Sequence, residues 1–238
     1  MVYSSRSLWS ETATSDSPRH ILTGFHRADV VIIGAGFTGL RAALELSESG
    51  LSVVVLEAGD VAHGASGSSG GQVNPIPPFN TPSQFRKLLG TEYAQRLTNT
   101  YIQSADDLFA TIKKYQIDCQ ARQNGWLRVF HNAKALRKEE VCVKEWNEHG
   151  AGIEFIGRSE IERKSGTSAY HSGIITPQGG AVQPLSLSRG LAKAAEQRGV
   201  KIYSKSAVLS LDKSEGKWTA KTSIGSVLSD WVIIATNG

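Results

Sequence analysis

The sequence predicts an α/β fold organised around a parallel β-sheet, and three neighbouring features near its N-terminus carry this prediction. A short run of apolar, β-branched residues at 30–33 is typical of a strand covered by helices on both faces. Glycines in a G-x-G-x-x-G pattern follow it directly, and a helical pattern with apolar residues from Leu40 to Leu46 then ends at Gly50. A second apolar run at 52–56 completes a strand–helix–strand unit.

The glycine pattern formed by Gly34, Gly36 and Gly39 predicts a dinucleotide site. The first glycine allows a tight turn, the second lets the backbone approach a pyrophosphate, and the third lets the helix pack closely on the strand. Backbone N–H groups and the positive dipole end at the helix N-terminus would stabilise the phosphate charge. Glycines also cluster in ordinary turns, but the flanking strand, the helix and the acid described next favour the dinucleotide interpretation.

That acid is Glu57, which ends the second predicted strand. A carboxylate in this place can accept hydrogen bonds from the 2′- and 3′-hydroxyls of an adenosine ribose. It disfavours a 2′-phosphorylated dinucleotide, because two negative groups would meet. NAD and FAD both remain open at this point, so the predicted class is a Rossmann-like FAD/NAD(P)-binding domain.

A second dense glycine run, GASGSSGGQ, extends from Gly64 to Gln72. Small residues there would let backbone amides approach a ligand, although a flexible surface linker of Gly and Ser has the same composition. We favour the ligand interpretation, because loops at the C-terminal ends of parallel strands line the binding crevice.

Composition indicates an ordinary globular protein. The net charge of +4 is modest and the basic residues are scattered, which gives little support for a nucleic-acid surface. No run approaches the roughly 20 apolar residues that span a bilayer, and residues 1–27 lack the apolar core of a signal peptide. We therefore expect a cytoplasmic protein with neither a membrane nor a nucleic-acid partner.

The cysteines and histidines do not predict chemistry of their own. Cys119 and Cys142 are too few for a disulfide framework or a metal cluster, so we expect two small buried thiols and no metal site. The isolated histidines of the middle section are interpreted as surface or core imidazoles, not as catalytic bases; they are His131, His149 and His171.

The order of elements predicts a nucleotide-binding domain that is interrupted by an insertion. Residues 1–27 are expected to form an extended arm that is at most lightly packed. Residues 28–72 and 184–238 are assigned to the discontinuous cofactor-binding domain, and residues 73–183 to an inserted part of an α+β substrate domain.

Periodicity, turn signals and capping signals place the remaining elements. In the insertion we expect helices at 91–116 and 133–148, and a third, short helix that begins with a capping box of Ser159 and Glu162. We also expect a strand at 125–130 and a strand with a turn over 170–183. After it we expect a helix from Pro184 to Gly199 and strands at 200–204, 207–212, 217–222 and 231–235.

Four stretches together resemble the FAD-dependent amine and amino acid oxidases of the D-amino acid oxidase family, especially members similar to γ-glutamylputrescine oxidase. They are DVVIIGAGFTGLRAALELSESGLSVVVLEA, GASGSSGGQVNP, PLSLSRGLAKAAEQRGVKIYSKSAV and WVIIATNG. The second stretch is the most specific to this family. The resemblance covers the whole chain, which corresponds to the N-terminal half of such an enzyme.

The resemblance implies a set of FAD-contacting residues. Gly34, Gly36 and Gly39 would contact the pyrophosphate, Glu57 the ribose, and Val208, through its backbone, the adenine. The loop between pyrophosphate and isoalloxazine would contain Ala65, Ser66, Gly70, Gly71 and Gln72. The remaining expected contacts are Phe37, Thr38, Ala58, Ala235 and Thr236. Relatives usually have Arg-Asn-Gly-Gly where this chain has Ser68-Ser69-Gly70-Gly71, so a hydroxyl replaces a side-chain amide near the flavin.

The implied reaction is hydride transfer from the carbon bearing a neutral amine to flavin N5, with hydrolysis of the imine and reoxidation of the flavin by oxygen to give hydrogen peroxide. The cofactor carries this chemistry, so no catalytic residue is assigned. The expected substrate is a small-molecule amine or amino acid. A nucleotide-binding remnant without turnover and an NAD-dependent dehydrogenase are the alternatives. The chain alone is not expected to turn over; a partner chain or a missing C-terminal half would complete it.

Overall fold

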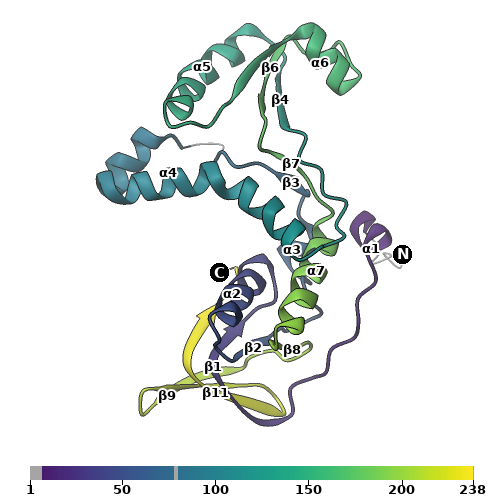
Figure 1. Ribbon diagram of the computed structural model, residues 1–238, viewed down its shortest axis with the longest axis vertical. Helices are drawn as coiled ribbons and strands as arrows, with labels where there is room; N and C mark the ends of the chain where they lie inside the picture. The colour runs from purple at the N-terminus through teal and green to yellow at the C-terminus, as the bar shows by residue number, and fades with distance from the viewer. Residues whose placement is uncertain (1–6, 78–79, 238) are drawn as a thin grey trace. The chain divides into compact units, whose positions relative to one another are not determined.

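The computed structural model describes residues 7–77 and 80–237, which form two compact units (Figure 1). The first unit contains the chain up to Gly70, residues 115–119, and the chain from Gln183 onward. The second contains residues 71–114 and 120–182.

The first unit is built on a six-stranded sheet with the strand order β8-β2-β1-β11-β10-β9. Four strands are parallel: β1 (Gly24–Ile33), β2 (Val53–Leu56), β8 (Lys201–Tyr203) and β11 (Gly225–Ile234). A hairpin of β9 (Ser210–Ser214) and β10 (Lys217–Lys221) adds to β11 in antiparallel fashion. The predicted α/β class with a parallel sheet is therefore confirmed.

Helices α2 (Phe37–Glu48) and α7 (Pro184–Gln197) lie side by side against the parallel strands (Figure 1). Both helices turn alanines and leucines inward, which allows close helix packing; Ala43 and Ala195 are fully buried. Gly50 and Gly199 were predicted to end these two helices. Both follow their helix directly after its C-cap residue and have positive φ. Two short helices, α1 (Leu8–Thr12) and α3 (Ala65–Ser68), complete the unit.

In the first unit, three strands begin more than one residue away from their predicted start. β1 begins at Gly24 and β11 at Gly225, because the two strands pair in parallel along their whole length, from Gly24 opposite Gly225 to Ile33 opposite Ile234. The strand expected at 207–212 is shifted to 210–214. It begins later because Ser206 is held in a buried loop, where its N–H donates to the Glu57 carbonyl at 2.7 Å.

The second unit contains a three-stranded antiparallel sheet and a two-stranded ribbon. The sheet has the order β4 (Trp126–Phe130), β6 (Ser172–Thr176), β5 (Glu154–Gly157), and the ribbon pairs β3 (Gln72–Val73) with β7 (Gly180–Ala181). The helices are α4 (Pro82–Lys114), α5 (Ala133–Glu148) and α6 (Arg158–Ser165) (Figure 1). The strand β5 was not predicted.

Helix α4 is interrupted at Gly90, whose φ of 75° and ψ of 172° are not helical. The residues after Gly90 form the helix that was predicted at 91–116. The helical residues before Gly90, from Pro82 onward, were not predicted. The break lets Phe85 stack on Tyr101 with ring centroids 5.7 Å apart, while Trp146 of α5 meets both rings edge-on. No helix within residues 7–77 and 80–237, α4 included, has the length and apolarity needed to cross a membrane.

The capping box predicted at Ser159 and Glu162 is wrong. Gly157 occupies the N-cap of α6 without a side-chain hydrogen bond, so Ser159 already lies within the first turn. The expectation of two buried thiols holds for Cys119 and not for Cys142, which is half-buried. Burial, and then the neighbouring Glu139 carboxylate, raises the pKa of the Cys142 thiol.

Most residues of 7–26 are exposed, as expected of an arm that is at most lightly packed, but the prediction needs correction at Leu22 and Arg19. Leu22 is fully buried under the sheet, and its N–H donates to Ser206 Oγ at 2.9 Å. Arg19 makes a bidentate contact with Glu196 of α7, with Nε···Oε1 at 2.7 Å and Nη2···Oε2 at 3.0 Å. Periodicity could not show these contacts, because the arm packs through single polar and apolar side chains.

Truncating Leu22 tests this correction. We expect Leu22→Ala to lower the free energy of unfolding by about 2–5 kcal/mol, as is usual for a fully buried leucine. The matched control is Leu8→Ala, because Leu8 is 67% exposed and should change the free energy by less than about 0.5 kcal/mol. Urea denaturation of both variants measures the difference, and equal midpoints would refute the packing described for the arm.

Candidate cofactor site

A cleft of about 740 Å³ lies in the first unit at the C-terminal ends of the parallel strands. The segment after β1 contributes Gly34, Gly36, Phe37 and Thr38, and the segment after β2 contributes Glu57 and Ala58. The turn into α3 lines it from Ala62 to Ser66, residues 207–208 line it beyond β8, and residues 234–237 line it at the end of β11. Five separate chain segments therefore meet at one edge of the sheet.

Within the turn after β1, glycine is required by the surrounding backbone at Gly34 and Gly39. A Cβ on Gly34, where φ is 107°, would lie 2.5 Å from the Ala235 carbonyl oxygen. A Cβ on Gly39 would lie 2.0 Å from the carbonyl oxygen of Gly34, so this glycine lets α2 pack against the turn. Gly36 is the N-cap of α2 and faces Ser66, whose Oγ would be 2.8 Å from an added Cβ. The backbone is thus exposed to the cleft at the N-terminal end of a helix.

Two backbone amides hold the carboxylate of Glu57. The Ala35 N–H donates to Oε2 at 2.7 Å and the Gly59 N–H donates to Oε1 at 2.9 Å. These bonds fix the orientation of the carboxylate beside the glycine turn. Each oxygen retains a further lone pair, so the group can still accept hydrogen bonds from hydroxyl donors.

The segment 205–208 is tied to the same strand end. The Lys205 N–H donates to the Gly59 carbonyl at 2.8 Å, and the Ser206 N–H donates to the Glu57 carbonyl. These bonds place Ala207 and Val208 on the cleft wall next to the carboxylate. A planar apolar group can pack against this wall while a neighbouring hydroxyl reaches Glu57.

Ser66 connects the α3 turn with the N-terminus of α2. Its Oγ accepts the Phe37 N–H at 3.0 Å, which satisfies one of the amide groups that a helix leaves unpaired at its start. Because this contact is a single neutral hydrogen bond, an anion can compete for the same N–H. The donor set at this end of the cleft suits a phosphate group.

The cleft brings together most of the residues named from the sequence. It contains Gly34, Gly36, Phe37, Thr38, Glu57, Ala58, Ala65, Ser66, Val208, Ala235 and Thr236. Gly39 is buried beneath the turn and does not line the cleft. Gly70 does not line it either, and Gly71 and Gln72 belong to the second unit, where Gln72 Oε1 accepts the Trp126 Nε1–H at 3.1 Å.

Sequence reasoning missed several lining residues, among them Ala62, His63 and Ala207. Ala62 has a φ of 59°, which turns the chain between β2 and α3 and brings the exposed His63 to the cleft. No local pattern marks an alanine for a left-handed conformation, so the sequence offered no signal for this turn. Across residues 7–77 and 80–237 no group of three His, Cys, Asp or Glu side chains is arranged to hold a metal ion.

The features of this cleft are those of a dinucleotide-binding α/β protein, and comparison with known families specifies the class. A family model described as FAD dependent oxidoreductase (DAO) matches residues 29–238. The chain therefore belongs to the DAO family of FAD-dependent oxidoreductases.

Two bacterial oxidoreductases are similar to this chain over nearly its whole length. The chain is 32% identical over 236 residues to gamma-glutamylputrescine oxidoreductase of Escherichia coli strain K12, covering 97% of this chain and 54% of that protein. It is 33% identical over 237 residues to the probable oxidoreductase OrdL of Haemophilus influenzae, covering 98% and 54%. The chain spans about half the length of these relatives.

Solved structures show the same fold. An L-amino acid deaminase from Proteus vulgaris superposes with a TM-score of 0.74 at 22% identity, over 94% of this chain and 50% of that one. A glycine oxidase from Geobacillus kaustophilus superposes with a TM-score of 0.71 at 21% identity, over 88% and 55%. The predicted family, the Rossmann-like fold and FAD as the cofactor are confirmed, and the NAD-dependent alternative is set aside.

The close contact beneath the glycine turn can be tested by substitution. We expect Gly39→Ala to lower the free energy of unfolding by about 1–3 kcal/mol or more, because the added Cβ meets a backbone carbonyl that cannot rotate away. Gly70→Ala is the control, since a Cβ there meets nothing within 4 Å and should be nearly neutral. Thermal and urea unfolding compare the two; equal stability would contradict the close approach of α2 to the turn.

Proposed function

We propose that this chain forms the FAD-binding part of an amine or amino acid oxidase that converts a CH–NH group to an imine, with oxygen reoxidising the flavin to give hydrogen peroxide. The observation that carries the proposal is the Glu57 carboxylate, held by two amides beside a glycine turn in a cleft of about 740 Å³. This arrangement fits the adenosine ribose of FAD, and membership of the DAO family supports the identity of the cofactor.

The binding roles are proposed from the hydrogen-bond donors and acceptors of the cleft and, for Gly70, Gly71 and Gln72, from the family resemblance alone. The amides at Gly36, Phe37 and Thr38 would receive the pyrophosphate at the N-terminus of α2. The Gly34 N–H donates to the Leu56 carbonyl, so Gly34 would contribute the open backbone of the turn, with Gly39 supporting it from below. Glu57 and Ala58 would hold the ribose. Val208 would lie against the adenine, and the residues continuing toward the isoalloxazine would be Ala65, Ser66, Gly70, Gly71, Gln72, Ala235 and Thr236.

FAD supplies the two-electron chemistry when it is bound, so the protein groups have other tasks. The cleft residues would hold and orient the cofactor through its adenosine and pyrophosphate groups. The second unit would contribute part of a substrate domain, which positions the C–H bond and excludes water. The names of the relatives, a gamma-glutamylputrescine oxidoreductase, an amino acid deaminase and a glycine oxidase, support a small-molecule substrate that carries an amino group.

Removing the Glu57 carboxylate tests the ribose assignment. A hydrogen bond to a charged group contributes about 1.5–3 kcal/mol, so Glu57→Ala should weaken FAD binding by at least about tenfold. Asp60→Ala is the control, because Asp60 is an exposed carboxylate three residues away that does not line the cleft. Titration of FAD fluorescence measures both affinities, and an unchanged affinity of the Glu57 variant would rule out the assignment.

Substrate class is the second test. The chain, produced with any sequence that its reading frame encodes after Gly238 and supplied with FAD, should bleach its flavin with primary or secondary amines or amino acids in the absence of oxygen. Readmission of oxygen should restore the colour and release peroxide. Hydroxy acids should be inert. Bleaching by hydroxy acids alone would overturn the amine assignment, and bound FAD that no amine reduces would favour a nucleotide-binding protein without turnover.

A further inference from the structure

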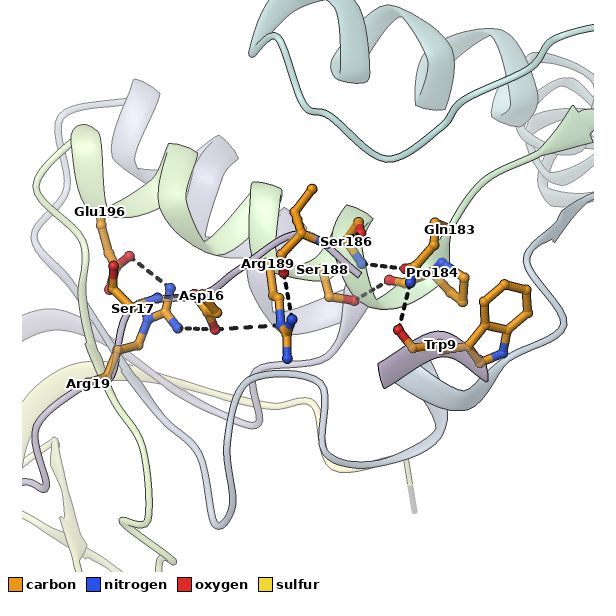
Figure 2. Close-up of polar contacts among 11 residues, drawn as sticks. Trp9, Asp16, Ser17, Arg19, Gln183, Pro184, Ser186, Ser188, Arg189 and Glu196 are labelled. Atoms are coloured by element: carbon orange, nitrogen blue, oxygen red, sulfur yellow. Dashed lines mark hydrogen bonds and ion pairs between the residues drawn. The ribbon is translucent and has the colours of Figure 1, made fainter. Parts of the chain in front are cut away.

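The N-terminal arm is attached to the first turn of α7 by a buried glutamine (Figure 2). Gln183 is 2% exposed and is the N-cap of α7. Its Oε1 accepts the Ser186 N–H at 2.6 Å, while its Nε2 donates to the Trp9 carbonyl at 2.7 Å and to Thr12 Oγ1 at 3.3 Å. One side chain thus caps the helix and holds the arm.

Neighbouring contacts continue this attachment along α7. The Thr14 N–H donates to Ser186 Oγ at 2.9 Å, and Arg189 Nη1 donates to the Thr14 carbonyl at 2.6 Å. At the other end of the helix Arg19 binds both Glu196 and Asp16 (Figure 2). Burial alone would lower the pKa of Arg19, but its hydrogen bonds to Glu196 and Asp16 outweigh this effect and raise the pKa, so the guanidinium stays charged at all ordinary pH values.

The first turn of α7 in turn supports the wall of the cofactor cleft. Leu185, which follows Pro184 in that turn, packs against Gly67 of α3: a Cβ added to Gly67 would lie 3.2 Å from Leu185 Cδ1 and 2.3 Å from the Ala62 carbonyl oxygen. The adjacent residue, Ser66, accepts the Phe37 N–H at the start of α2. A continuous set of contacts therefore runs from the arm through Gln183 and Leu185 to Ser66.

We propose that Gln183 is a positioning residue for the FAD site: it couples the N-terminal arm to the α3 turn and thereby holds residues 64–66 in the conformation that binds the cofactor. Gln183 does not line the cleft, so it acts through α7 and not by touching FAD. This inference rests on the proposed assignment of the cleft as the FAD site.

The physical basis of this coupling is that the Gln183 amide makes hydrogen bonds both to the arm and to the first turn of α7. Without its amide, the buried Ser186 N–H loses its side-chain partner and the Trp9 carbonyl keeps only the Ala13 N–H; a buried polar group without a partner is strongly disfavoured. The first turn of α7 and the arm then separate locally, since water can solvate these groups only if the turn opens. Leu185 moves with that turn, and the α3 wall loses its support.

The test compares Gln183→Leu with Arg19→Met in the full chain. Arg19→Met removes the ion pair at the far end of α7 and serves as a control for lost stability. We expect Gln183→Leu to weaken FAD binding by about tenfold and to speed amide hydrogen exchange at residues 64–69 in the absence of FAD. Arg19→Met should lower the unfolding midpoint while leaving the FAD affinity within about twofold and exchange at residues 64–69 unchanged.

A milder variant covers the case in which Gln183→Leu does not fold. Ser186→Ala removes the acceptor of the Thr14 N–H and leaves a good helix former in α7, so it loosens the arm without weakening the helix. It should also weaken FAD binding and speed exchange at residues 64–69. The positioning role is wrong if Gln183→Leu and Ser186→Ala both bind FAD as tightly as the wild-type chain does, while Glu57→Ala binds it more weakly. If the wild-type chain fails to bind FAD, the proposed function itself fails.

Discussion

The parallel pairing of β1 with β11 is the constraint on which the cofactor cleft depends. It joins residues 24–33 to residues 225–234 and brings Ala235 so close to Gly34 that its N–H donates to the Ile33 carbonyl at 2.8 Å. No side chain fits at Gly34 in this arrangement. The cleft therefore forms where two strand ends that are far apart in the sequence lie next to each other, and the contact between them determines the conformation of the glycine turn.

The chemistry of the site is provided mostly by main-chain groups. Glu57 is the exception, and even its carboxylate is oriented by the amides of Ala35 and Gly59. Main-chain donors bind a phosphate or a ribose regardless of what a distant substrate contains. A cleft lined by main-chain donors therefore carries little information about the substrate on which such a protein acts.

The features that could be predicted from the sequence are those that depend on residues close together in the chain. Gly34, Gly36, Gly39 and Glu57 were found because a strand–turn–helix with an acid after the second strand is a local pattern, and α5 was found from its periodicity. The packing of Leu22 and Arg19, the early start of β1 and the left-handed Ala62 were missed. Their partners lie far away in the chain or in backbone conformations that no residue type marks, so only the tertiary structure determines them.

The long separation between β1 and β11 also has a consequence for the order of folding. During synthesis the β1–α2–β2 unit emerges early, and one edge of β1 stays unpaired until the arrival of β11, which begins about 170 residues after the end of β2. That edge is apolar from Val30 to Ile33, as aggregation-prone strands are. Completion of this sheet therefore waits for a strand of large sequence separation, and pairing of this kind is slow because the intervening chain must first be closed into a loop.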